Sequence, residues 1–158
     1  MKAASVNEIK TELKSLSPAQ ITELCLRLAR FKKENKELLT YLLFEADDIE
    51  TYISNIKKET EESFKDINST NLYFAKKSLR KILRTINRYI KYTGSKTAET
   101  ELLIHFCSQL KNSKIKFHKS NALVNLYNAQ IKKINAAIST LHEDLQYEYK
   151  RELDALDN

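Results

Sequence analysis

The chain has one glycine and one proline among its 158 residues, and this scarcity limits what it can fold into. Glycine supplies the left-handed backbone of tight hairpins, and both residue types dominate short turns. Hydrophobic residues instead recur at spacings of three and four, which is typical of amphipathic helices. The sequence therefore predicts an all-α protein, built as an irregular multi-helix bundle or a short helical array of about six or seven helices.

Capping patterns indicate where the first two helices begin. Ser5 is followed by Glu8, and Ser17 is followed by Pro18 and Gln20. In such patterns the serine and the residue three positions later each satisfy a backbone N–H of the other, and proline suits the first helical position. The second of these helices is expected to place the following residues on its inner face: Ile21, Leu24, Cys25, Leu28 and Phe31.

Four more helices are expected in the middle of the chain. Residues 37–46 are apolar over most of the helix circumference, so this helix is expected at the heart of the core. Amphipathic helices are expected over residues 49–67, 72–93 and 97–110. Gly94 is expected to end the helix over 72–93 in the left-handed conformation.

The last element is expected to be a single long helix over residues 121–156, which contain no glycine or proline. Its apolar residues keep a heptad spacing. The seam runs from Val124 and Tyr127 through these candidates for an oligomer contact: Ile131, Ile134, Ile138, Leu141 and Leu145. Two interpretations stay open. The seam packs inside the bundle, or the end of the helix, from about residue 146, projects and dimerises.

Length and composition favour one soluble helical domain over residues 1–158, with 42% hydrophobic and 30% charged residues. The segment MKAASVNEIK carries charges where a signal peptide needs an apolar stretch, and no apolar run is long enough for a bilayer. We therefore expect a cytoplasmic protein with no membrane association. Cys25 and Cys107 are expected to be reduced core residues, with a disulfide between them as the lesser alternative.

Charge is distributed unevenly along the chain. Residues 67–142 carry fourteen Lys or Arg residues against two acids, whereas residues 143–158 carry two bases and six acids. On the helix expected over 72–93, one face collects candidates for binding a polyanion: Lys77, Arg80, Lys81, Arg84, Arg88 and Lys91. Tyr73 and Tyr92 lie within or beside this face and are candidates for stacking on bases. The alternative is a solvated face with no binding role.

Catalytic signatures are absent from the sequence. The three histidines lie far apart, and no HExxH, CxxC, GxSxG or P-loop pattern occurs. Glu101 and His105 lie four residues apart and are expected to form a hydrogen-bonded surface pair, because a bundle metal site needs such motifs from two helices. His105 and Cys107 cannot point the same way on a helix, so a Cys/His pair would require Cys25 or another histidine, such as His118, to be brought near by folding. No cofactor and no metal site are expected.

Two resemblances add to this picture. The stretch IKTELKSLSPAQITELCLRLA resembles the helix–loop–helix of SAP-type and Rho-N-type modules, a likeness that implies nucleic-acid binding. The stretches LCLRLARFKKENKELLTYLLFEADD, KKSLRKILRTINRYIKYT and TAETELLIHFC are similar to small uncharacterised bacterial helical proteins. That second likeness implies a helical fold and no activity.

The favoured interpretation is a non-enzymatic interaction module with a protein-partner or scaffold role. Its contact surface is expected to be the basic face of the helix over 72–93 or the C-terminal helix. Nucleic-acid or other polyanion binding through the basic face is the first alternative. An enzyme with a Cys/His or Glu/His site is the second.

Overall fold

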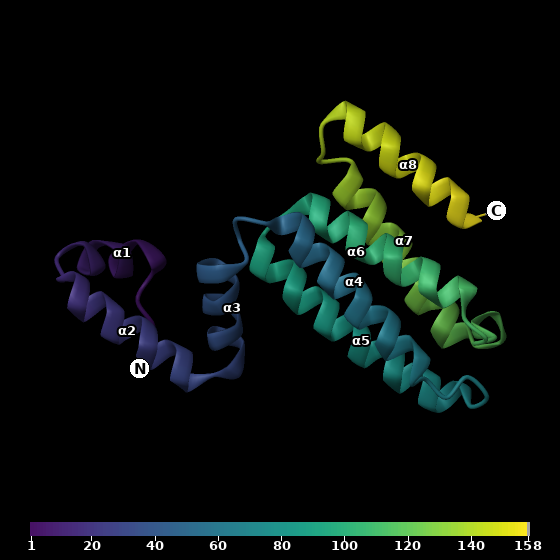
Figure 1. The fold of residues 1–158 in the computed structure, drawn as a ribbon, viewed down its shortest axis with the longest axis horizontal. Coiled ribbons are helices and arrows are strands. Elements are labelled where there is room, and N and C mark those ends of the chain that lie inside the picture. The colour runs from purple at the N-terminus through teal and green to yellow at the C-terminus, as the bar shows by residue number, and fades with distance from the viewer. Residues whose placement is uncertain (158) are drawn as a thin grey trace. The chain divides into compact units, whose positions relative to one another are not determined.

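The computed structural model describes residues 1–157, which form eight α-helices, one short 3₁₀ turn and no strand. The predicted all-α class is confirmed, with more helices than the six or seven expected. The elements are α1 (Val6–Lys14), α2 (Pro18–Phe31), α3 (Lys33–Phe44), α4 (Ile49–Lys65), α5 (Leu72–Thr93), α6 (Lys96–Asn112), η1 (Phe117–Lys119), α7 (Asn121–Ile138) and α8 (Glu143–Asp157) (Figure 1).

The chain divides into two compact units, Met1–Phe44 and Glu45–Asn158, here called unit 1 and unit 2. The single domain over residues 1–158 that the sequence favours stays a prediction. Length and composition do not reveal the division, because both units are built from helices with the same kinds of residue.

Unit 1 begins with two capped helices, as predicted. The Ser5 hydroxyl accepts a hydrogen bond from the Glu8 N–H, and the Glu8 carboxylate accepts one from the Ser5 N–H at 2.7 Å. Ser17 and Gln20 make the same reciprocal pair at the start of α2. These bonds satisfy backbone donors that have no partner inside the helix, so the local sequence is sufficient to define both starts.

Helix α3 does not occupy the centre of a core. It packs against α2 in unit 1, and Leu42, Leu43 and Phe44 are 55%, 64% and 79% exposed. The prediction that the helix over 37–46 is central is therefore wrong. A helix that is apolar on most sides needs neighbours on most sides, and α2 covers one side of it.

Helix α6 is the central helix of unit 2. It packs against α4, α5, α7 and α8, and Figure 1 shows these helices around it. Its side chains are buried around most of the circumference, including all five residues expected to point inward: Leu102, Leu103, Phe106, Cys107 and Leu110. The core of unit 2 is completed by Leu79 and Ile86 of α5 and by Leu123 and Ile134 of α7, all at most 1% exposed.

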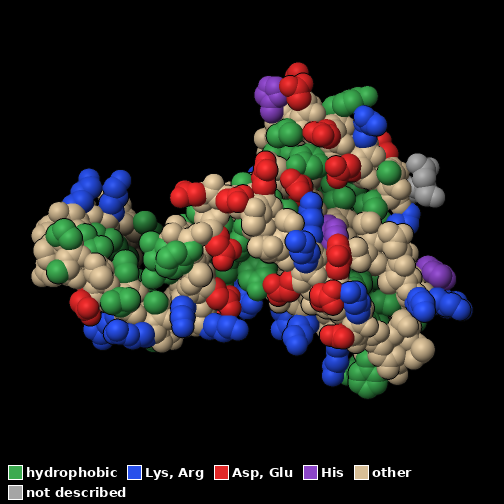
Figure 2. All heavy atoms as spheres, viewed as in Figure 1, with side chains coloured by type: hydrophobic (Ala, Val, Ile, Leu, Met, Phe, Trp, Pro, Cys, Tyr) green, Lys and Arg blue, Asp and Glu red, His purple; other side chains and the backbone are tan. Residues whose placement is uncertain are grey.

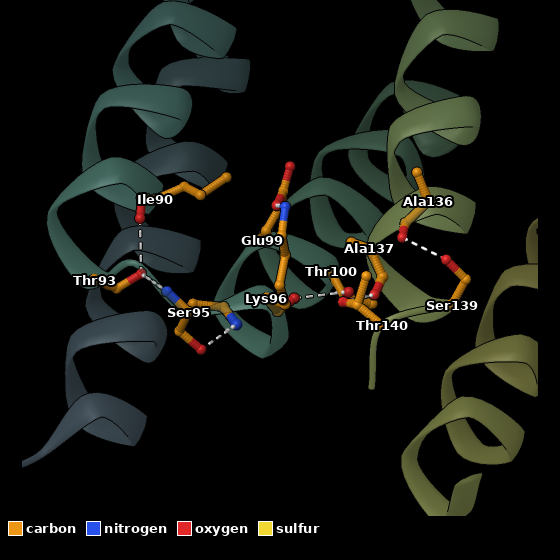
Figure 3. A network of polar contacts seen from close by, with 11 residues as sticks. Ile90, Thr93, Ser95, Lys96, Glu99, Thr100, Ala136, Ala137, Ser139 and Thr140 are labelled. Carbon is orange, nitrogen blue, oxygen red and sulfur yellow. Dashed lines mark hydrogen bonds and ion pairs between the residues drawn. The ribbon is translucent and has the colours of Figure 1, made fainter. Parts of the chain in front are cut away.

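Helix α5 is amphipathic with the boundaries that the sequence predicts. It buries Ala75, Leu79, Ile82, Leu83, Ile86 and Ile90. Gly94 follows it with φ 60° in the left-handed region, and its N–H donates to the Ile90 carbonyl. Beyond this turn, the Ser95 hydroxyl accepts the Ala98 N–H at the start of α6 (Figure 3). The single glycine therefore ends one helix directly before the next begins.

The prediction of one long C-terminal helix over residues 121–156 is wrong, because α7 ends at Ile138 and α8 begins at Glu143. The Ser139 hydroxyl donates to the Ala136 carbonyl at 2.8 Å, and the Thr140 hydroxyl donates to the Ala137 carbonyl at 2.7 Å (Figure 3). These hydroxyls satisfy carbonyls that a continuing helix would have bonded to later N–H groups.

The break allows α8 to pack against α6 and α7 instead of projecting. Tyr149 and Leu153 of α8 are 7% and 6% exposed. Gln146 supports the new helix, because its side-chain amide donates to the Leu141 carbonyl at 2.8 Å.

Candidate interaction surfaces

The basic face of α5 lies opposite the buried face of the same helix. Arg88 is half-buried. The other five predicted residues are exposed: Lys77, Arg80, Lys81, Arg84 and Lys91. Within the described part of the chain, none of these five forms an ion pair with a carboxylate. Their charge therefore faces solvent, which is the condition for attracting a polyanion.

The predicted stacking residues differ in accessibility. Tyr73 is 57% exposed near the start of α5, and the Lys77 ammonium lies 5.1 Å from its ring centroid. Tyr92 is half-buried near the other end, with its ring 6.2 Å from that of Tyr89. Phe74, which the sequence analysis did not single out, is 51% exposed beside Tyr73. Accessible aromatic surface thus gathers at the N-terminal end of α5.

A groove of about 350 Å³ lies between α4 and α5 and was not predicted. Lys81 reaches its rim from the basic face, and Glu59 and Asp66 reach it from α4 and the turn after it. The groove has mixed charge and hydroxyl groups from Thr60 and Thr85. Its acids interrupt the positive surface on this side of α5.

The Glu101 carboxylate joins three helices. It accepts a hydrogen bond from the Lys57 ammonium of α4 at 2.7 Å and another from the Tyr149 hydroxyl of α8 at 3.0 Å. Burial raises the pKa of Tyr149, and the adjacent Glu101 carboxylate raises it further because a negative neighbour disfavours the phenolate. The hydroxyl therefore remains a donor to Glu101 at neutral pH.

His105 contacts a different carboxylate. Its Nε2 atom lies 3.4 Å from Glu61 of α4, and burial lowers its pKa although Glu61 opposes this effect. The predicted Glu101–His105 surface pair is therefore not formed, because each side chain turns to a different partner on a neighbouring helix.

The remaining candidates for chemistry are dispersed. Cys107 is fully buried, and burial raises the pKa of its thiol to about 12, so the thiolate required of a nucleophile is scarce at neutral pH. His118 is exposed on η1, and Cys25 is half-exposed on α2. Both cysteines are free thiols, so the alternative of a disulfide between them is not realised, and Cys25 is not a core residue. Residues 1–157 contain no cluster of three or more His, Cys, Asp or Glu side chains suited to a metal ion.

The predicted oligomer seam takes part in the packing of unit 2. Ile134 and Ile138 are at most 1% exposed on α7, which packs against α6. Ile131, Leu141 and Leu145 are half-buried. The heptad spacing therefore coincides with an intramolecular helix contact, as one of the two interpretations of the sequence expects.

Unit 1 carries the apolar surface that the sequence analysis missed. Besides Met1, twelve large hydrophobic residues there are at least 36% exposed, and Figure 2 shows hydrophobic side chains at the surface over α1–α3 (Figure 2). They are Val6, Ile9, Leu13, Ile21, Leu24, Leu26, Leu28, Phe31, Leu38, Leu42, Leu43 and Phe44. Their helical spacing was visible in the sequence, but spacing alone does not tell whether anything covers the face.

The most regular part of this surface is on α2. Ile21, Leu24, Leu28 and Phe31 follow one another at spacings of three, four and three, and are 37%, 41%, 59% and 77% exposed. We call these four residues the α2 stripe. An adjoining groove of about 790 Å³ is lined by Leu16 and Leu24 together with Glu23, Arg27 and Arg30.

Comparison with protein-family models, curated proteins and solved structures found no match to this chain. Every helix within residues 1–157 is too short or too polar to cross a membrane.

Proposed function

We propose that this protein is a non-enzymatic helical interaction module that binds a protein partner through the apolar surface of unit 1. The observation that carries the proposal is the exposure of Leu28, Phe31, Leu43 and Phe44, each above half of its full area. Isolated exposed apolar residues are normal, but large contiguous apolar patches mark interaction sites. The proposed surface thus differs from the two that the sequence favours, the basic face of α5 and the C-terminal helix.

The experiment is affinity capture from an extract of the cells that make the protein, with the captured protein identified by mass spectrometry. We expect the wild type to retain one partner in near-stoichiometric amount and the Leu28→Glu/Phe31→Glu variant to lose it, because a charge in an apolar contact must be desolvated. Leu26→Glu is the matched control. Leu26 is 38% exposed on the opposite face of α2, so this variant should retain the partner. Equal retention by all three proteins would contradict the proposal.

A second candidate function is polyanion binding through the basic face of α5. It is supported by the five exposed cationic side chains that have no carboxylate partner among the described residues. Exposed Tyr73 and Phe74 at one end of the face could stack on bases.

Fluorescence anisotropy with labelled single-stranded and duplex nucleic acid, at low and at physiological salt, tests this candidate. We expect Arg80→Glu/Arg84→Glu to weaken binding and to reduce the slope of log K against log salt by about 0.9 for each duplex phosphate that the variant no longer neutralises. The control is Lys132→Glu/Lys133→Glu, which makes the same charge change at two exposed positions of α7. An equal loss of affinity in both variants would indicate a general charge effect and no specific surface on α5.

A further inference from the structure

Unit 1 buries few of its side chains. Among residues 1–44, all of which the structure describes, only Tyr41 is buried. Unit 1 spans residues 1–44, close to the length of about 40 residues below which a chain usually needs a disulfide, a metal ion or oligomerisation in order to fold. Cys25 is a free thiol, and the described residues hold no metal-binding cluster. Of these three means of stabilisation, oligomerisation is the one that the surface of unit 1 supports.

The apolar area that unit 1 exposes can be compared with the area that a stable dimer buries. At about 150 Å² for a large side chain, the lower end of the range for aromatic residues, the exposed fractions of these twelve residues of α1–α3, Leu26 on the opposite face of α2 included, correspond to about 1,000 Å² of apolar surface. The largest apolar patch on a typical monomer covers about 300–600 Å². A standard interface buries about 800 Å² on each partner. The four stripe residues account for about a third of this area, so an interface of standard size would also take in exposed apolar residues of α1 and α3.

The pattern on α2 indicates what kind of surface fits against it. Spacings of three, four and three place the stripe residues at positions that match the core of a two-helix contact, so a second helix with a stripe of the same kind would fit against it. The charges beside the stripe are of both signs, with Glu23 in the same groove as Arg27 and Arg30. A partner of one charge sign would meet repulsion there, whereas a copy of the same helix offers both signs.

From these observations we propose that the protein is a twofold-symmetric homodimer in which the α2 stripes of two copies pair in antiparallel orientation. In a twofold contact, each residue pair occurs twice, with the roles of the copies exchanged. With the axis near Leu26, Ile21 faces Phe31 of the second copy and Leu24 faces its Leu28. Glu23 then lies opposite the stretch between Arg27 and Arg30. This inference rests on the proposed function, because it names the partner that binds unit 1.

The test is the mass of the purified full-length protein in solution, measured by sedimentation velocity over a wide range of concentrations. The wild type is expected at twice the 18.4 kDa of one chain, and Leu28→Glu/Phe31→Glu at the monomer mass. Leu26→Glu makes the same chemical change on the same helix away from the stripe and should remain a dimer. Far-UV circular dichroism of all three proteins shows whether α2 stays helical.

A mixture of two single variants tests the antiparallel pairing itself. Mixing Leu24→Lys chains with Leu28→Glu chains brings opposite charges together at one of the two exchanged pairs. The mixture is therefore expected to dimerise more strongly than either variant alone. Absence of any gain, with both variants helical, would overturn the antiparallel arrangement.

The outcomes of these experiments distinguish failure of the homodimer from failure of the proposed function, which is binding of a protein partner through unit 1. A wild type that is monomeric at all concentrations overturns the homodimer. If that monomer still captures a different protein through the stripe, the proposed function stands with another partner, and if it captures nothing, both fail. A dimer that survives Leu28→Glu/Phe31→Glu also overturns the inference, because the contact would then lie elsewhere.

Discussion

His105 shows how burial of one ionisable side chain links stability to pH. Its side chain is 17% exposed, and its pKa is lowered because burial penalises the imidazolium. Below the ordinary histidine value of about 6.5, the unfolded chain binds the proton more readily than the folded one. The contribution of His105 to stability is therefore complete above that pH and is lost as the pH falls below it.

We predict that His105→Gln flattens the fall in the free energy of unfolding between neutral and mildly acidic pH, measured by urea unfolding at several pH values. His118→Gln, a change at an exposed position on η1, should keep the wild-type dependence. A wild-type slope in the His105 variant would show that burial of this imidazole has no effect on folding.

Some residue roles could be predicted from the sequence, and others could not. Gly94, Ser5 and Ser17 act through neighbours within four residues, so their cap positions were visible in the sequence. The partners of Glu101 lie 44 and 48 residues away, and no local pattern identifies them.

Helix α8 packs on the rest of unit 2 through a short apolar face and a hydrogen bond to Glu101. The Tyr149 hydroxyl donates to Glu101 at 3.0 Å, and Leu153 is buried one turn further along. The hydrogen bond can be removed without changing the packing, because a Tyr149→Phe substitution deletes the hydroxyl and keeps the ring.

We predict that Tyr149→Phe lowers the free energy of unfolding by about 1 kcal/mol, the typical net value of one such hydrogen bond, and that amide hydrogens of α8 exchange faster. Tyr147→Phe is the matched control, since Tyr147 lies on the same helix with 69% exposure and should tolerate the same change. Denaturant unfolding and hydrogen exchange read out both effects. An equal cost for the two variants would mean that the Glu101 contact adds nothing.

At the scale of elements, helix starts were easier to predict than the packing of helices. The boundaries of α5 follow from Asn71 and Gly94, whose capping roles are local. The break after Ile138 was missed because Ser139 and Thr140 are tolerated inside helices. What favours the break is the packing of α8 on α6 and α7, which a single sequence does not display.

The whole molecule combines a well-packed unit with a poorly packed one. Unit 2 encloses residues such as Leu102 and Phe106 at 0% exposure, whereas unit 1 buries Tyr41 alone among its residues. Local opening free energies follow the number of buried apolar contacts. This difference in packing is not visible in the sequence, because hydrophobic spacing reveals a potential core face and not the neighbour that covers it.

We predict that amide hydrogens of α2 exchange faster than those of α6, measured by mass spectrometry of peptides. Because pairing of two copies would stabilise unit 1 by mass action, protection of α2 should also rise with protein concentration while that of α6 stays constant. Equal protection of the two helices at every concentration would contradict both the weak packing of unit 1 and its pairing.

The two cysteines give the molecule a native reporter in each unit. Cys25 is half-exposed on α2, one residue after Leu24 of the stripe. Cys107 of α6 is buried in the core of unit 2, and burial raises the pKa of its thiol to about 12. A thiol-reactive dye added to the unaltered protein should therefore label Cys25 first and reach Cys107 only when unit 2 opens. The order and rate of the two reactions would time events in each unit separately, without any mutation.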